Sequence, residues 1–132
     1  ERFIQNFNRL NDNCRNRLVI ENDDKLNCWS VKQLMTDFYP KTKIPITFDY
    51  LHHKCHPDGW TEQQGIRFCC LTWGNIKPLF HYSESAPGNN PRKHADYAVE
   101  DFYTYGDLDY DVDMELKMKD KAIAKFMEGV SI

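Results

Sequence analysis

No apolar run in this sequence approaches the ~20 residues that a membrane-spanning helix requires, so no membrane segment is predicted. An excess of positive charge is missing as well. The chain has 17 Lys and Arg residues against 20 Asp and Glu residues, a net charge of −3. This balance argues against a protein that binds nucleic acid through bulk charge alone. It is compatible with a site in which bound divalent cations offset carboxylates and meet phosphate.

The five cysteines lack the Cys-x-x-Cys spacing of zinc knuckles and redox motifs. An odd set without this spacing is typical of reduced thiols in an intracellular protein. The sequence also has no secretion signal and no initiating Met. We therefore expect an intracellular location and interpret the chain as an excised or incomplete piece of a longer protein.

The 132 residues, 41% of them hydrophobic and 14% aromatic, predict a single globular domain, residues 1–132. Strands are predicted at 17–21, 44–49, 77–81 and 111–116. Helices are predicted at 1–10, 30–40, 61–71, 95–105 and 119–128, with Ser30 and Thr61 as N-caps. One helix followed by four strand–helix units indicates an α/β fold with parallel strands and right-handed crossovers.

Each predicted strand ends in a carboxylate or an imidazole, from Glu21, Asp49, His81 and Glu115 in turn. The carboxyl ends of parallel strands meet at one edge, where α/β folds bind their ligands. His52 lies three residues after Asp49, so one strand end offers two ligands. A carboxylate in such a position also commonly caps the next helix, which is the alternative interpretation of each strand-end acid.

The stretch 81–97 is a loop rich in Pro, Gly and Asn that follows the third strand. It carries a second histidine, His94, beside Arg92 and Lys93, and a hydroxyl at Ser83. Two imidazoles, a hydroxyl and two cations suit a metal ion that holds a phosphate. Ser83, Arg92 and Lys93 are therefore candidate phosphate-binding residues.

Strand ends and loop together offer three carboxylates and three imidazoles. Mixed nitrogen and oxygen ligation suits Mn²⁺, Fe²⁺ or Zn²⁺ better than Ca²⁺ or Mg²⁺. The ligands are numerous enough for two ions, the arrangement that clamps both sides of a phosphoryl transfer. The predicted metal ligands are Glu21, Asp49, His52, His81, His94 and Glu115.

The remaining conspicuous side chains have plainer interpretations. His53 and His56 are predicted to be solvated loop residues. The lysines of the segment 117–121 are predicted to form a solvated helix face, with DNA contact as the alternative. The three tryptophans are expected to pack in the core rather than stack on bases, and the segment 103–105 (Tyr-Thr-Tyr) stays open between the two.

Four segments, in order, resemble the UV damage endonuclease family: Leu18-Val-Ile-Glu-Asn-Asp-Asp24, Phe48-Asp-Tyr-Leu-His-His53, His81-Tyr-Ser83 with Arg92-Lys-His-Ala-Asp-Tyr97, and Met114-Glu-Leu-Lys117. The resemblance covers nearly the whole chain, and the combined motifs are specific. It implies strands five to eight of a TIM barrel, the C-terminal half. The expected fold is therefore a (β/α)8-type half barrel of about four βα units.

The resemblance also implies a function: a Mn²⁺-dependent repair enzyme that nicks damaged double-stranded DNA on the 5′ side of UV photoproducts. All six predicted ligands fall on metal ligands of the family, while catalytic residues stay unassigned. One alternative is a non-catalytic half barrel that binds metal or assembles without cutting DNA. A metal-dependent sugar isomerase of the same fold is disfavoured by the motif set.

The sequence departs from the family pattern in two respects. Leu79 stands where the family has an active-site lysine, and the nearest lysine is Lys77. The N-terminal half of the barrel is missing, which leaves two open sheet edges and an unclosed interior. Val19, Phe48 and Leu79 are expected to face a partner or solvent, so we expect a homodimer or a complementary N-terminal half.

Overall fold

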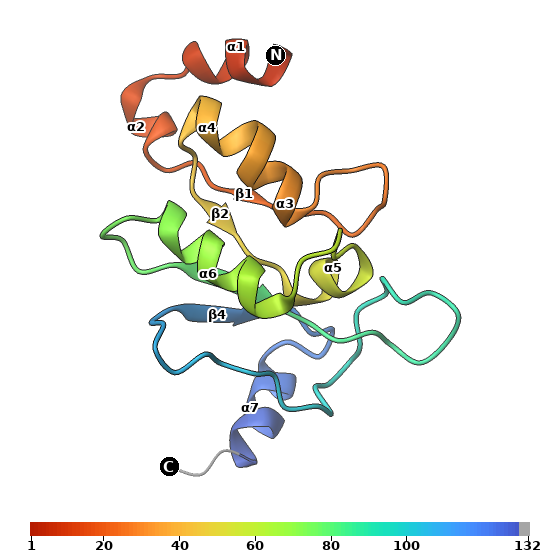
Figure 1. Cartoon of the computed structure of the whole chain (residues 1–132). Helices are drawn as coiled ribbons and strands as arrows, with labels where there is room; N and C mark the ends of the chain where they lie inside the picture. The colour runs from red at the N-terminus through yellow and green to blue at the C-terminus, as the bar shows by residue number, and fades with distance from the viewer. Residues whose placement is uncertain (130–132) are drawn as a thin grey trace.

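Short parallel strands form the centre of the fold in the computed structural model, which describes residues 1–129 (Figure 1). The strands are β1 (Ile20–Glu21), β2 (Ile46–Thr47), β3 (Leu79–Tyr82) and β4 (Asp111–Met114). β1 pairs with β2 and β3 pairs with β4, both in parallel. A parallel bridge between Asp49 and His81 joins the two pairs, and the His81 amide donates to the Phe48 carbonyl at 2.9 Å. The predicted mixed α/β class with parallel strands is confirmed.

Helical segments flank these strands: those in the middle of the chain lie across β1 and β2, the first two lie toward the N-terminus and the last lies toward the C-terminus (Figure 1). They are α1 (Arg2–Asn8), α2 (Asp12–Arg15), α3 (Val31–Gln33), η1 (Leu34–Phe38), α4 (Tyr39–Thr42), α5 (Tyr50–Cys55), α6 (Glu62–Thr72) and α7 (Asp120–Glu128). Within residues 1–129, none of them combines the length and the apolar character that crossing a membrane requires. The five cysteines are all free thiols.

The two predicted N-caps form complete capping boxes. The Ser30 hydroxyl accepts from the Gln33 amide at 3.1 Å, and the Gln33 side chain accepts from the Ser30 amide at 2.9 Å. Thr61 and Gln64 repeat this pair of contacts with the same two distances. Each box satisfies two backbone donors at a helix start, which explains why both helices begin where the sequence predicts.

The helical run that begins at Val31 was expected to end near Pro40, but it continues to Thr42. Residues 34–38 form a π-helical turn, and Pro40 lies in the first turn of the α-helical segment that follows. A wider π-turn shifts the backbone hydrogen-bond pattern, so a residue without an N–H is tolerated here. The run then stops at Lys43, which adopts a left-handed conformation with φ 58°.

The prediction of a helix at 95–105 is wrong, because this segment is irregular. The Glu84 carboxylate accepts from the backbone amides of Val99 and Glu100 at 2.9 and 3.2 Å. The Tyr103 carbonyl accepts from the Tyr50 hydroxyl at 3.0 Å. Backbone groups that a helix would pair internally are thus bonded to the core side chains of other segments.

Phe48 was expected to face a partner or solvent. It is instead fully buried between β2 and the helices. Its ring contacts Phe80 at a centroid distance of 6.1 Å and His53 at 5.1 Å. Val19 and Leu79 do stay accessible, with 40% and 38% of their surfaces exposed. Side chains alternate along a strand, so Phe48 points to the helices while residues of the opposite parity point away from them.

Gly65 lets α6 approach β2 closely. A Cβ atom at this position would lie 2.7 Å from Cε2 of Phe48, whose ring is held on several sides in the core. We predict that Gly65→Ala destabilises the fold by roughly 1–3 kcal/mol, the usual cost of overpacking, even though alanine favours a helix. Urea denaturation measures this free energy of unfolding.

Gly106→Ala is the matched control, since a Cβ atom there would meet no atom within 4 Å. It should leave the free energy of unfolding nearly unchanged. A Gly65→Ala protein as stable as the parent would show that the close approach of α6 to Phe48 is not a packing constraint.

Candidate metal centre

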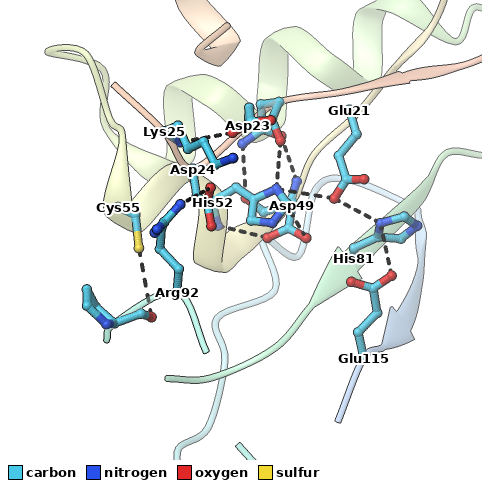
Figure 2. A network of polar contacts seen from close by, with 12 residues as sticks. Glu21, Asp23, Asp24, Lys25, Asp49, His52, Cys55, His81, Arg92 and Glu115 are labelled. Carbon is cyan, nitrogen blue, oxygen red and sulfur yellow. Dashed lines mark hydrogen bonds and ion pairs between the residues drawn. The ribbon is translucent and has the colours of Figure 1, made fainter. Parts of the chain in front are cut away.

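The strand ends bring four of the predicted ligands together, as Figure 2 shows. Glu21 ends β1, Asp49 follows β2, His81 lies in β3 and Glu115 follows β4. One potential ligand atom from each of these four residues lies within 4.8 Å of the other three. This convergence was expected from their positions along parallel strands. We call these four residues the strand-end cluster.

His81 is held between two carboxylates of the cluster. Its Nδ1 lies 3.2 Å from Glu21 Oε1 and 3.5 Å from Glu115 Oε1. The hydrogen bond to Glu21 raises the pKa of His81 to about 9. Burial opposes ionisation of Glu21, but the hydrogen bond with His81 and the contact with Asp49 outweigh it and lower the pKa of Glu21.

Asp49 both caps a helix and belongs to the cluster. Its Oδ1 accepts from the His52 amide at 2.8 Å, which makes Asp49 the N-cap of α5. Its Oδ2 is buried and has no hydrogen-bond partner among residues 1–129. Burial and the neighbouring Glu21 raise the pKa of Asp49 to about 7. The cap interpretation and the ligand interpretation are therefore compatible for this residue, because each uses a different oxygen.

Asn22 positions Asp49 and was missed by the sequence analysis. The fully buried Asn22 side chain accepts from the Asp49 amide at 2.8 Å and donates to the Asp49 carbonyl at 3.2 Å. These two bonds connect the segment that follows β1 to the segment that follows β2. The available signal was an amide side chain directly after the carboxylate that ends a buried strand.

His52 borders the cluster. Its Nδ1 lies 2.7 Å from the Asn22 carbonyl oxygen, 3.4 Å from Glu21 Oε1 and 3.8 Å from Asp49 Oδ2. Burial alone would lower the pKa of His52, but the charge of Asp49 and the bond to the Asn22 carbonyl raise it. The backbone contact at Nδ1 leaves Nε2 as the ring nitrogen available for another partner.

The other four sequence candidates lie outside the four-atom cluster. His94 forms an antiparallel bridge with Ser85 and lines a shallow cavity together with Glu115. Ser83 has a buried hydroxyl that lines a different cavity. Arg92 lies 3.7 Å from Asp24, and Lys93 is exposed. The three candidate phosphate-binding residues, Ser83, Arg92 and Lys93, are thus not gathered in one place.

The segment that follows Asp49 is helix α5 and not an exit loop, so the interpretation of His53 and His56 as solvated residues is wrong. They are only 4% and 7% exposed. The Nε2 of His53 lies 3.1 Å from the Trp60 carbonyl oxygen, and the ring packs on Phe48. The aspartate cap at the end of β2 was the signal for a helix that turns His53 into the core.

Lys77 does not reach the position of Leu79 in the strand. Its Nζ lies 2.9 Å from Asp111 Oδ1 and 3.4 Å from Asp109 Oδ1, at the start of β3 and β4. Leu79 begins β3, two residues after Lys77 and two residues before His81 of the cluster. Among the tryptophans, Trp73 has a packing role, because its indole N–H donates to the Ile46 carbonyl at 2.8 Å.

The donor set of the cluster fits a divalent cation. Three carboxylates meet within a few ångströms, and burial together with the neighbouring Glu21 raises the pKa of Asp49. A bound cation would offset this charge and give the buried Asp49 Oδ2 the partner that it lacks among residues 1–129. Mixed oxygen and nitrogen ligands are typical of transition metals rather than Ca²⁺.

All of the chain, residues 1–132, matches the family model of the UV-endonuclease UvdE. The chain belongs to this family. Among its relatives, the UV DNA damage endonuclease of Clostridium perfringens is 31% identical over 94% of this chain. The UV-damage endonuclease of Neurospora crassa is 33% identical over 96% of it. The crystal structure of SacUVDE superimposes with a TM-score of 0.77, at 30% identity and over 98% of this chain.

This UvdE-family chain is much shorter than the relatives that it matches. It spans 31% of the Clostridium perfringens protein and 20% of the Neurospora crassa protein. It spans 46% of the SacUVDE chain. The family membership therefore applies to the chain, while the activity of a whole relative does not transfer to it directly.

In the presence of a chelator, the raised pKa of Asp49 should make the free energy of unfolding of this UvdE-family chain depend on pH. An exposed Asp titrates near 4, whereas folded Asp49 titrates near 7, so the folded state binds the proton more tightly. The ionisation of Asp49 thus lowers the free energy of unfolding as the pH rises from about 4 to about 7. Asp49→Asn should therefore gain stability relative to the parent over this range.

Urea denaturation at a series of pH values in EDTA measures this difference. Exposed Asp113→Asn is the control and should follow the parent at each pH. A constant difference between Asp49→Asn and the parent from pH 4 to 7 would contradict the assignment of the raised pKa to Asp49.

Proposed function

We propose that this chain is the metal-holding part of a UV damage endonuclease, which cuts the DNA backbone on the 5′ side of UV photoproducts. The observation that carries this proposal is the strand-end cluster of Glu21, Asp49, His81 and Glu115 in a chain of the UvdE family. Two relatives described as UV-damage endonucleases support the DNA-repair function over the non-catalytic alternative.

In this proposal the cluster, His52 and His94 hold divalent metal, with Mn²⁺ as the preferred ion because the donors mix nitrogen and oxygen. When bound, the metal supplies positive charge that polarises a phosphodiester. The chain itself orients the donors. Glu21 and Glu115 fix the His81 ring from two sides, and α5 holds the Asp49 carboxylate through Oδ1. Asn22 keeps the ends of β1 and β2 in register.

We further propose that the chain is the C-terminal half of a TIM barrel, strands five to eight. Consecutive parallel strands and the match to 46% of SacUVDE support this assignment. Parallel sheets are normally covered on both faces, and Val19 and Leu79 are accessible on the face away from the helices. A complementary N-terminal half, or a second copy of this chain, would cover that face and contribute further ligands.

Double-stranded DNA with UV photoproducts is the proposed substrate, and an intracellular location is proposed with it. Leu79 is the residue that favours the non-catalytic alternative, because the family resemblance predicts a lysine there and Lys77 is paired with Asp111 and Asp109. The site chemistry of the chain is otherwise that of a metal-dependent phosphodiesterase: clustered carboxylates with a histidine between them.

A cutting assay tests this function. An end-labelled duplex with one UV photoproduct is incubated with Mn²⁺ and the chain, alone or joined to the N-terminal half of the Clostridium perfringens relative. We expect the joined protein to nick the irradiated duplex 5′ to the lesion. Glu21→Gln should reduce the rate by roughly a hundredfold or more, since it removes a charged ligand.

Glu128→Gln, an exposed change at the end of α7, is the charge-matched control and should cut at the parental rate. Equal cutting of unirradiated DNA would contradict the proposed substrate. Parental cutting by Glu21→Gln would show that the strand-end cluster is not the reacting centre. An inactive joined protein that still binds Mn²⁺ would favour the non-catalytic alternative.

A further inference from the structure

A cationic hollow lies beside the strand-end cluster, on the side of His52 away from Glu21 and His81 (Figure 2). Residues of three segments line it: the chain after β1, helix α5, and the hairpin that follows β3. Its lining includes Asp24, Lys25, Lys54, Ser85, Pro91 and Arg92. Three of them are cationic and only Asp24 is anionic, in a chain whose net charge is −3.

Asp24 positions the guanidinium of Arg92. The Asp24 side chain is only 14% exposed, and its Oδ1 lies 3.7 Å from Arg92 Nη1. This ion pair is longer than a hydrogen bond, so it directs the guanidinium without engaging its whole set of donors. The Arg92 side chain is itself 42% exposed and can meet a ligand in the hollow. An arginine of this kind presents a planar fork that matches two oxygens of a phosphate.

The hairpin that carries Arg92 is internally braced. The Ala86 amide donates to the Lys93 carbonyl at 2.7 Å, and the Ser85 hydroxyl donates to the Pro91 carbonyl at 2.6 Å. The Arg92 amide donates to Asn90 Oδ1 at 3.1 Å. Because these bonds fix the backbone around Arg92, a ligand that binds there pays little conformational entropy for ordering the loop.

We propose that this hollow is a subsite for a backbone phosphate of nucleic acid, held by Arg92, Lys54 and Lys25 next to the metal centre. A phosphodiester is the anionic group that fits three cations beside a proposed DNA-cutting site, because neighbouring phosphates recur along the same backbone. The inference rests on the proposed DNA substrate but not on the metal chemistry. Arg92 was already expected to bind phosphate, together with Ser83 and Lys93. These two do not line the hollow, and the proposed subsite has Lys25 and Lys54 in their place.

Fluorescence anisotropy with a labelled DNA duplex tests this subsite, in EDTA so that no cutting occurs. Lys54→Ala/Arg92→Ala should weaken binding about tenfold or more at low salt. The slope of log K against log salt concentration should fall by about 1, since each phosphate contact contributes about 0.9. Arg92→Lys, which keeps the charge but not the planar fork, should give an intermediate loss of affinity.

Lys32→Ala/Lys41→Ala removes the same charge from exposed positions on α3 and α4 and should bind DNA like the parent. Circular dichroism confirms that each double variant is folded. Equal affinity and equal salt slope for the two double variants would overturn the proposal, as would an unmodified chain that does not bind the duplex. Loss of binding only in Lys54→Ala/Arg92→Ala upholds the subsite even where the cutting assay fails.

Discussion

The carboxylate of Asp49 is buried where β2 ends, and its two oxygen atoms have different surroundings. Oδ1 accepts from the His52 amide and so starts helix α5. Oδ2 is buried without a hydrogen-bond partner within residues 1–129, and one oxygen of the carboxylate belongs to the strand-end cluster. The backbone on both sides of this carboxylate is bonded to the Asn22 side chain and, through the bridge with His81, to β3. The start of α5, the pairing of the strands and the candidate metal centre therefore all meet at one residue, through its side chain and its backbone.

Parallel strand order explains why acids from distant parts of the sequence meet at this point. Burial of their charges opposes folding. Burial raises the pKa of Asp49 and the hydrogen bond to Glu21 raises the pKa of His81, so both shifts favour protonated forms that reduce the repulsion. A divalent cation would serve the same purpose and bring positive charge to a bound phosphodiester. The same repulsion that costs stability without metal would thus give affinity for metal in the UvdE-family chain.

Periodicity and capping residues were sufficient to predict much of this arrangement. Ser30 and Thr61 mark their helices because a capping box is a local signal, and Glu21 and His81 follow apolar strands that are easily recognised. Segment 95–105 has helical spacing, but its backbone is bonded by Glu84 and Tyr50 from elsewhere in the chain. Tertiary bonds of this kind leave no local pattern, and the buried positions of Asn22 and His53 likewise depend on neighbours that are distant in sequence.

Isothermal titration of the chain with Mn²⁺ tests the metal centre at the strand ends, because it needs neither DNA nor a partner half. We expect saturable binding that weakens at least about tenfold in Glu21→Gln and in His81→Ala, since each change removes a donor of the cluster. The exposed change Glu128→Gln should bind Mn²⁺ like the parent. Undetectable binding by the parent, or parental affinity in both cluster variants, would contradict a metal centre at the strand ends.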